Sequence, residues 1–164
     1  MSTEVPELDA YDTRILEELQ RDARISMAEL GRKVHLSQPA VTERVRKLEI
    51  AGYIKGYRAV VDYQRLGYGI RALVRAGRVE YGRMLQLIEQ TPEVVNAFNV
   101  TGEDSWILEI AVIDVEHLDA VVTKFCLLAE TSTSIVLNMP REHSAVLPAR
   151  RENIKPAIRK VTGR

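Results

Sequence analysis

The stretch that decides the fold runs from Ser26 to Ile54 and reads SMAELGRKVHLSQPAVTERVRKLEIAGYI. Ser26 is followed three residues later by Glu29, a capping-box pattern that predicts the start of a short helix. Ser37 is a second N-cap candidate, and Pro39 falls in the first turn of the next helix, where a missing backbone N–H costs nothing. Because only a few residues separate the two helices, we expect a tight turn and a steep crossing, as in a helix-turn-helix.

Neighbouring patterns complete the first half of the chain. A preceding helix from Asp9 to about Gln20 has Asp9 as its expected N-cap. In the helix after Ser37, apolar residues repeat at i, i+4 and i+7, and Gly52 stands where a left-handed C-cap is wanted; the repeating residues are Val41, Val45 and Leu48. Residues 53–61 are rich in β-branched and aromatic side chains, which predicts a strand that serves as a wing or a connection.

The second half of the chain changes character after a hinge signal at Gly67, Tyr68 and Gly69. Its apolar patterns predict strands and helices in the order β-α-β-β-α-β, a ferredoxin-like arrangement; the expected elements are 70–79, 82–91, 94–100, 106–112, 114–129 and 133–139. Two helices cover only one face of such a sheet, and the strands carry apolar residues on both faces. We therefore expect the bare face to pair with another chain, giving at least a dimer. The fold class is α+β, a winged helix-turn-helix followed by a ferredoxin-like domain.

The composition restricts the class of protein. The chain has 164 residues, 46% of them hydrophobic and 28% charged, which excludes a wholly disordered chain. The sequence contains no apolar run of about 18 residues and no secretory signal, and it has a single cysteine, so we expect a cytoplasmic protein with no membrane partner.

The net charge of zero is a cancellation between segments. Residues 21–58 carry nine basic and four acidic side chains, whereas residues 70–140 carry five basic and ten acidic ones. Residues 150–164 add six basic side chains and one acidic one, either as a frayed solubilising helix or as an accessory DNA contact. Because counterions screen distant charges, a polyanion responds to the local field, and the block at 21–58 remains a candidate nucleic-acid surface.

Residues that could carry catalysis are scattered. The histidines His35, His117 and His143 have no shared metal-ligand spacing, and Cys126 lies in an apolar run where a buried small side chain is expected. No phosphate loop, nucleophile elbow or dinucleotide motif occurs. We therefore predict that the protein is not an enzyme and needs neither a cofactor nor a metal.

The second helix of the helix-turn-helix carries the candidate reader surface. Opposite its apolar stripe lie Gln38, Pro39, Thr42 and Arg46, residue types that contact base edges or phosphates in the major groove. The remaining candidate DNA-binding residues would position the backbone: Arg24, Ser26, Ser37, Arg44, Lys47 and Lys55. Any one of these basic residues could instead be a solvated surface charge.

Two segments, LDAYDTRILEELQRDARIS and LSQPAVTERVRKLEIAGYIKGYRAVVD, resemble the Lrp/AsnC family of transcriptional regulators, and the ERVRKLE run is the most specific part of the match. The resemblance implies a DNA-binding domain at 8–69 with its helix-turn-helix at 27–46, an effector-binding and oligomerisation domain at 70–145, and a basic tail at 146–164. It also implies dimers that assemble further, often to octamers, and that bind amino acids or related small molecules.

In that family a Gly-x-x-Asp loop lines the effector site, and the matching stretch here contains Thr101, Gly102, Glu103, Asp104, Ser105 and Trp106. Gly102 matches, but Ser105 occupies the usual aspartate position and the carboxylate lies one residue earlier, at Asp104. Thr133 and Ser134 are expected near the same pocket on the resemblance. The alternative is that residues 102–104 only form a hairpin turn.

The sequence thus predicts a sequence-specific DNA-binding transcriptional regulator that acts on double-stranded DNA as a homo-oligomer and responds to a small molecule, with an amino acid as the expected effector. The alternative is an amino-acid sensor that acts through protein partners and uses its helical domain for docking. Steep salt dependence of duplex binding would favour the first interpretation.

Overall fold

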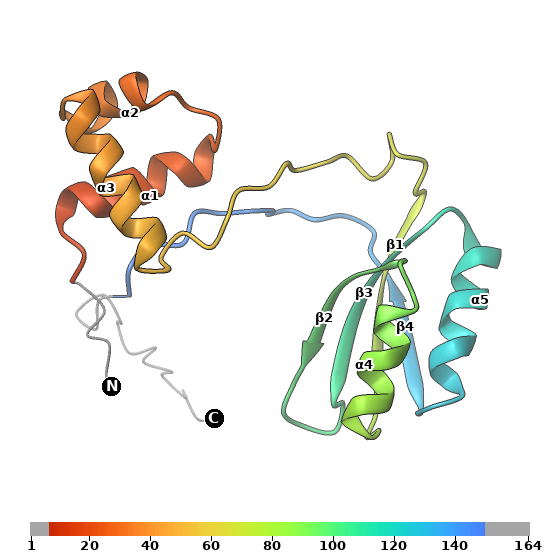
Figure 1. Ribbon diagram of the computed structural model, residues 1–164. Helices are drawn as coiled ribbons and strands as arrows, with labels where there is room; N and C mark the ends of the chain where they lie inside the picture. The colour runs from red at the N-terminus through yellow and green to blue at the C-terminus, as the bar shows by residue number, and fades with distance from the viewer. Residues whose placement is uncertain (1–6, 150–164) are drawn as a thin grey trace, which may run out of the picture. The chain divides into compact units, whose positions relative to one another are not determined.

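The computed structural model describes residues 7–149, and these form two compact units (Figure 1). The first unit contains residues 7–59 together with 141–149, and the second contains residues 60–140. The basic tail at 150–164 lies outside the described residues.

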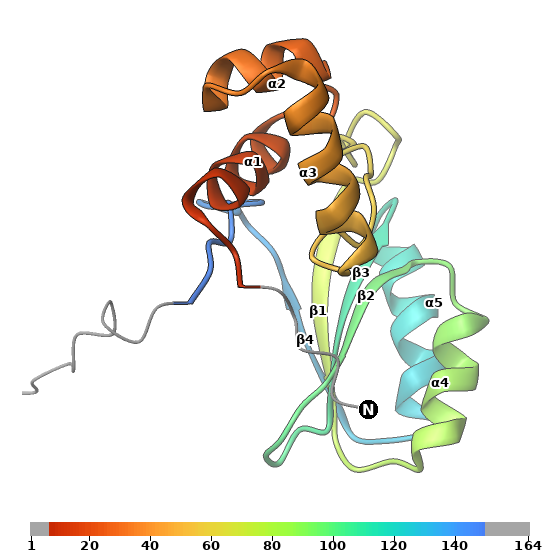
Figure 2. The ribbon, with the colours of Figure 1, turned by 60° about the vertical axis from the view of Figure 1, so that its left-hand side comes forward.

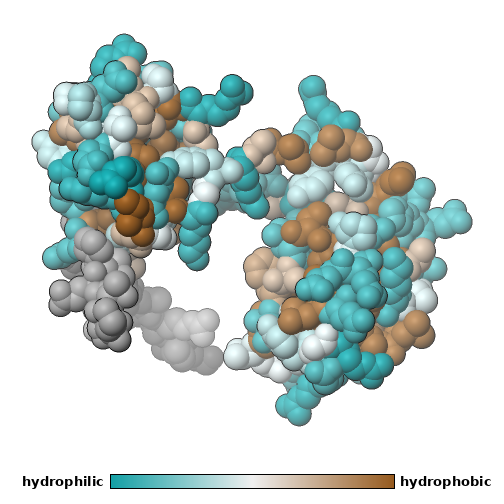
Figure 3. All heavy atoms as spheres, in the orientation of Figure 1, coloured by the Kyte–Doolittle hydropathy of each residue, from teal (hydrophilic) through white to brown (hydrophobic). Residues whose placement is uncertain are grey.

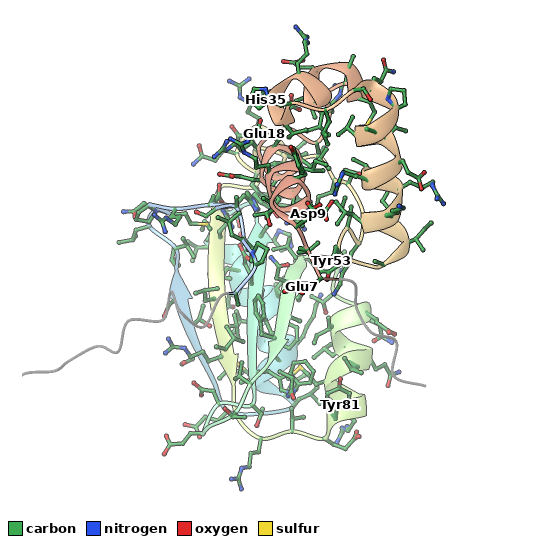
Figure 4. The ribbon with its side chains drawn as sticks, turned by 90° about the vertical axis from the view of Figure 1, so that its left-hand side faces the viewer. Glu7, Asp9, Glu18, His35, Tyr53 and Tyr81 are labelled. Carbon is green, nitrogen blue, oxygen red and sulfur yellow. The ribbon has the colours of Figure 1, made fainter. Side chains whose placement is uncertain are left out.

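Three helices make up the first unit: α1 (Ala10–Arg21), α2 (Met27–Val34) and α3 (Gln38–Ile50). Their N-caps are Asp9, Ser26 and Ser37, as the sequence predicts. Ser26 Oγ accepts from the N–H of Glu29 at 3.2 Å, which is the hydroxyl half of the expected capping box. The reciprocal capping box belongs instead to α1, where Asp9 (labelled in Figure 4) and Asp12 each accept from the other's backbone N–H.

The core of the helical unit joins one face of each helix. The predicted stripe of α3 is buried and packs with residues of α1 and α2; the core residues are Ile15, Leu19, Ile25, Leu30, Val34, Val41, Val45 and Leu48. Gly52 has a φ of 76°, the left-handed conformation expected after α3.

The turn between α2 and α3 is set by a close backbone approach. His35 ends α2 in the left-handed region, with φ 59° and ψ 41°, and the N–H of Leu36 donates to the carbonyl of Gly31 at 2.8 Å. A Cβ on Gly31 would lie 2.7 Å from the carbonyl oxygen of Leu36. The tight turn therefore requires glycine at position 31 because a side chain would collide with backbone.

The predicted strand at 53–61 is wrong for the described chain. Residues 54–61 run without regular secondary structure into the turn at Tyr63–Gly67, and residues 7–149 supply no strand beside them (Figure 1). A β-branched run becomes a strand only where a neighbouring backbone pairs with it. Within one chain the wing is therefore an irregular connection with exposed apolar residues, which include Tyr57, Val60 and Val61.

The second unit has the expected ferredoxin-like order of elements: β1 (Ile70–Ala76), α4 (Tyr81–Glu89), β2 (Val94–Asn99), β3 (Trp106–Val112), α5 (Val115–Cys126) and β4 (Thr131–Ile135). The four described strands form an antiparallel sheet in the order β2-β3-β1-β4, and α4 and α5 cover one face (Figure 2). Beneath these helices the strands bury Val74, Leu108 and Ile110, with Met84 and Phe125 from the helices.

The last strand differs from its predicted bounds of 133–139. β4 begins at Thr131 and ends at Ile135 because its partner β1 begins at Ile70, so residues beyond Val136 have almost no strand beside them. The predicted burial of Cys126 is also wrong. The cysteine is exposed at the end of α5, and its Sγ lies 3.0 Å from Oγ1 of Thr131.

We predict that Gly31→Ala destabilises the protein by about 1–3 kcal/mol because the added Cβ overpacks against the Leu36 carbonyl. The direction of the change in stability is diagnostic, because replacing glycine by alanine in a helix interior normally stabilises a protein by about 1 kcal/mol. The measurement is urea unfolding followed by circular dichroism. Gly82→Ala in α4 is the matched control, because the atoms nearest to its Cβ would be those of a side chain, the carboxylate of Glu80 at 3.1 Å, and not backbone. A stabilised Gly31→Ala protein would contradict this account of the turn.

Candidate nucleic-acid interface and effector region

The candidate reader face of α3 is exposed. Gln38, Pro39, Thr42, Arg46 and Lys47 all reach solvent, while Val41, Val45 and Leu48 hold the opposite side of the helix in the core. The hydroxyl of Thr42 donates to the carbonyl of Gln38 at 2.8 Å, which leaves its oxygen lone pairs and its methyl group for a partner. The helix is thus fixed on one side and presents polar groups on the other.

Arg46 is not isolated on this face. Its Nε donates to Oε2 of Glu43 at 2.9 Å and its Nη2 donates to Oε1 at 2.7 Å, a bidentate pair one helical turn apart. The Arg46 guanidinium lowers the pKa of the Glu43 carboxyl, and the carboxylate raises the pKa of Arg46, mainly through these side-chain hydrogen bonds. Both groups therefore stay charged at neutral pH.

Arg44 points away from the reader face. Its Nη1 lies 2.7 Å from Oδ2 of Asp9 and 2.7 Å from Oδ1 of Asp12, and its guanidinium carbon lies 5.4 Å from the ring centre of Tyr11. The hydrogen bonds that Arg44 donates to Asp12 and then to Asp9 raise the pKa of Arg44. These contacts tie α3 to the first turn of α1, so this guanidinium is engaged within the fold.

The other candidate phosphate contacts fall into two groups. Ser26 and Ser37 use their side-chain oxygens as N-caps, although both residues are exposed at helix starts where backbone N–H groups suit a phosphate. Arg24 and Lys55 are exposed, Arg24 before α2 and Lys55 after α3, with their charges in solvent.

The candidate effector loop joins β2 to β3. Thr101, Gly102, Glu103 and Asp104 are exposed, and Gly102 has a φ of 123°. The backbone of Ser105 is fully used: its N–H donates to the carbonyl of Ala76 at 2.9 Å, and its carbonyl accepts from Val100 and from the side-chain amide of Asn99. The loop is therefore held by hydrogen bonds at its C-terminal end, at Ser105, whereas residues 101–104 are exposed to solvent.

The remaining predicted effector residues are dispersed. Trp106 is buried in the core of the second unit, with its ring 5.3 Å from that of Tyr81, which projects from the first turn of α4 (Figure 4). Thr133 and Ser134 lie in β4, opposite Val74 and Leu73 of β1, so β1 separates them from β3 and from the β2–β3 loop. The structure brings the loop to the end of the sheet where β4 begins but does not gather all eight residues.

Two residues that the sequence reasoning passed over are part of these regions. Glu43 lies within the reader face, and Arg75 of β1 lies beside the effector loop, with its Nε 4.0 Å from Oδ2 of Asp104. The sequence alone could have indicated Glu43, because its spacing from Pro39 and Arg46 places all three residues on one face of the helix. Arg75 is distant in sequence from Asp104, and only the pairing of β1 with β3 brings them together.

Helix-turn-helix and ferredoxin-like units in one chain define a class of two-domain DNA-binding regulators. An AsnC-type helix-turn-helix domain matches residues 8–49, and an Lrp/AsnC ligand-binding domain matches residues 71–146. The transcriptional regulator LrpC of Bacillus subtilis is 37% identical over 133 residues, which cover 80% of this chain and 92% of LrpC. The glutamate uptake regulatory protein of Zymomonas mobilis is 32% identical over 151 residues, or 88% of this chain and 92% of that protein.

Two solved structures of transcriptional regulators have the same fold as this chain. The structure of B. subtilis LrpC superposes with a TM-score of 0.78 at 36% identity over 82% of this chain and 97% of that chain. A Neisseria meningitidis transcriptional regulator in complex with L-methionine gives a TM-score of 0.79 at 26% identity over 85% of this chain and 96% of that chain. The chain belongs to the Lrp/AsnC family of transcriptional regulators. It is a DNA-binding regulator with a ligand-binding domain, and its relatives are regulators rather than enzymes.

Residues 7–149 contain neither a candidate metal site nor a candidate membrane-spanning helix. No group of three or more His, Cys, Asp or Glu side chains is placed to hold a metal ion. None of the helices in this range combines the length and the apolar character that crossing a bilayer requires.

We predict that Arg44→Ala lowers the free energy of unfolding by about 1–2 kcal/mol because it removes two charged hydrogen bonds between helices. Hydrogen bonding from the backbone N–H of Asp12, followed by that from Arg44, lowers the pKa of Asp9 below 3.8. A carboxyl whose pKa is lower in the folded state stabilises the fold at pH values above its unfolded pKa, and this stabilisation is lost on acidification. The difference in free energy of unfolding between wild type and Arg44→Ala should therefore shrink below about pH 4.

Urea unfolding at pH 7 and at about pH 3 measures this difference. Arg14→Ala, which removes a charge from an exposed side chain of α1, is the control and should change stability by less than about 0.5 kcal/mol. An Arg44→Ala protein as stable as the control would show that this contact does not hold α3 to α1.

Proposed function

We propose that α3 enters the major groove and reads a specific duplex through Gln38, Thr42 and Arg46. The observation that carries this proposal is the packing of α3, whose buried stripe fixes the orientation of the exposed polar face. Gln38 has the amide geometry to bind adenine N6 and N7, and the Thr42 methyl suits a thymine methyl. Pro39 lies on the same exposed face as these readers. Contacts to the phosphate backbone that would position the helix are proposed for Arg24, Ser26, Ser37, Lys47 and Lys55.

The reader assignment predicts that Arg46→Ala and Gln38→Ala each weaken specific binding by about tenfold, the usual contribution of one good base contact. Gel-shift titration on duplexes selected by wild-type protein from a random library measures the effect. Arg14→Ala is the control for loss of one positive charge elsewhere on the helical unit. Wild-type affinity in both variants would reject α3 as the reader, and no duplex binding at low salt would favour a protein-docking role for the helical unit.

We propose that the effector is an amino acid that binds at the β2–β3 loop. Asp104 offers a carboxylate for an ammonium group, and Arg75 offers a guanidinium for a carboxylate, at the open end of a pinned loop. Glu103, Thr101, the backbone of Gly102 and the hydroxyl of Ser105 supply further polar groups there. Support for an amino acid also comes from the L-methionine complex of the N. meningitidis relative.

The protein is proposed to act in the cytoplasm as a homo-oligomer. The sheet face that α4 and α5 leave uncovered carries Leu73, Ile107 and Phe98, the last of them 53% exposed. The space-filling view looks onto the opposite side of the second unit, where α4 and α5 lie, and shows apolar side chains among hydrophilic ones there (Figure 3). A second copy of the chain would bury Leu73, Ile107 and Phe98 on the uncovered face, and a dimer that pairs further, to an octamer, would present several reader helices to one duplex.

The effector assignment predicts that at least one of the twenty amino acids raises the melting temperature, because a ligand bound only by the folded state stabilises it. A ligand at about one hundred times its dissociation constant adds about 2.7 kcal/mol. Asp104→Ala and Arg75→Ala should each abolish the shift, whereas Glu89→Ala, at the end of α4, should retain it. An unchanged shift in Asp104→Ala would place the site elsewhere on the protein.

A further inference from the structure

Glu43 lies in the middle of the most exposed side of α3. Pro39, Glu43, Arg46 and Ile50 follow one another at spacings of four, three and four residues, so they share the face opposite the buried stripe. The side chains of Glu43 and Arg46 are 48% and 57% exposed. A carboxylate at this place repels the phosphates of any duplex that α3 approaches, which makes it a costly neighbour for a surface that only has to attract DNA.

The geometry of the pair shows what the carboxylate does to the arginine. Glu43 occupies the Nε and Nη2 side of the Arg46 guanidinium through two hydrogen bonds of 2.9 and 2.7 Å. A guanidinium has five N–H donors, so three remain: both on Nη1 and the second one on Nη2. These three donors have no partner among residues 7–149, and Nη1 with the second N–H of Nη2 forms a two-donor fork of the kind that can bind O6 and N7 of guanine.

The pair contributes little to the stability of the fold. It joins two residues of one helix, whereas Arg44 joins α3 to α1. Exposed pairs of this kind contribute little to stability because water and salt screen both charges. Loss of Glu43 should therefore leave the helical unit folded, and an effect on DNA binding can be read directly.

We propose that Glu43 is a positioning residue for base recognition, which holds Arg46 with its outer fork directed to a guanine and discourages the same arginine from binding phosphate. This inference rests on the proposed entry of α3 into the major groove. An arginine that is already held loses less side-chain freedom on binding, so the correct base gains affinity. An unheld arginine reaches phosphates of any sequence, which raises affinity for every duplex and lowers discrimination.

The test compares Glu43→Ala, Glu43→Gln and Arg46→Ala with wild type on two probes: a random-sequence duplex pool and the duplex that wild-type protein selects from it. Arg46→Ala identifies the base pair at which guanine preference depends on this arginine. At that base pair we expect Glu43→Ala to lose about five- to tenfold of the guanine preference, close to the full contribution of a bidentate contact. Its affinity for the random pool should rise about threefold at low salt, since a negative charge has left the interface.

Glu43→Gln separates the two effects. Its amide oxygen keeps one of the two acceptors, so guanine preference should recover in part, whereas affinity for the random pool should stay as high as in Glu43→Ala because the charge is gone. Glu17→Ala is the matched control. Glu17 forms a comparable exposed pair with Arg21 at 2.5 Å on α1, away from the reader face, and its loss should leave guanine preference unchanged.

Each negative result has a distinct meaning. If Glu43→Ala keeps the guanine preference of wild type, Glu43 does not position Arg46 and the inference fails while the proposed function stands. If Arg46→Ala leaves the guanine preference unchanged at every base pair, Arg46 contacts the DNA backbone and the inference also fails. If wild-type protein selects no duplex at all, the proposed function itself fails.

Discussion

The carbonyl oxygen of Leu36 lies where a side chain on Gly31 would begin, 2.7 Å from an added Cβ. This contact lets the chain turn within a few residues between α2 and α3, with His35 in the left-handed region and Ser37 ready to cap the next helix. The direction of α3 then follows, because Val41, Val45 and Leu48 must face the core that α1 and α2 provide. The exposed face of α3, and everything it can contact, depends on a turn that has no room for one methyl group.

The basic surface of the helical unit is smaller than its charge count suggests. Residues 21–58 carry nine basic side chains, but several are already engaged with carboxylates inside the unit. Arg44 meets Asp9 and Asp12, Lys33 meets Glu18 at 2.7 Å, and Arg21 meets Glu17 and Glu18. Acidic residues of α1, outside the basic block, supply most of these partners. The charge free to attract a polyanion is therefore concentrated on fewer side chains, which favours a defined contact over a diffuse one.

Much of the fold is readable from the sequence because it depends on local chemistry. Asp9, Ser26 and Ser37 cap the three helices as their residue types indicate, and Gly52 takes the expected left-handed conformation. Predictions fail where a distant partner decides the outcome. Residues 53–61 have strand-forming side chains but no strand beside them within the described chain, and β4 ends close to the start of its partner β1. The same limit applies to the sites, since the inward turn of Arg44 and the approach of Arg75 to Asp104 depend on elements far apart in sequence.

The helical unit is not continuous in sequence, and this affects how it is made. Residues 141–149 belong to it, and Val146 exchanges two backbone hydrogen bonds with the side-chain amide of Gln20 on α1, at 2.8 and 3.0 Å. Val146 is 126 positions after Gln20, a length of chain that takes about 6–25 s to synthesise at ordinary rates of translation. On the ribosome α1, α2 and α3 can therefore pack early, yet Gln20 gains its partner only after the entire ligand-binding unit has emerged. The DNA-binding unit is thus completed last, although most of it is made first.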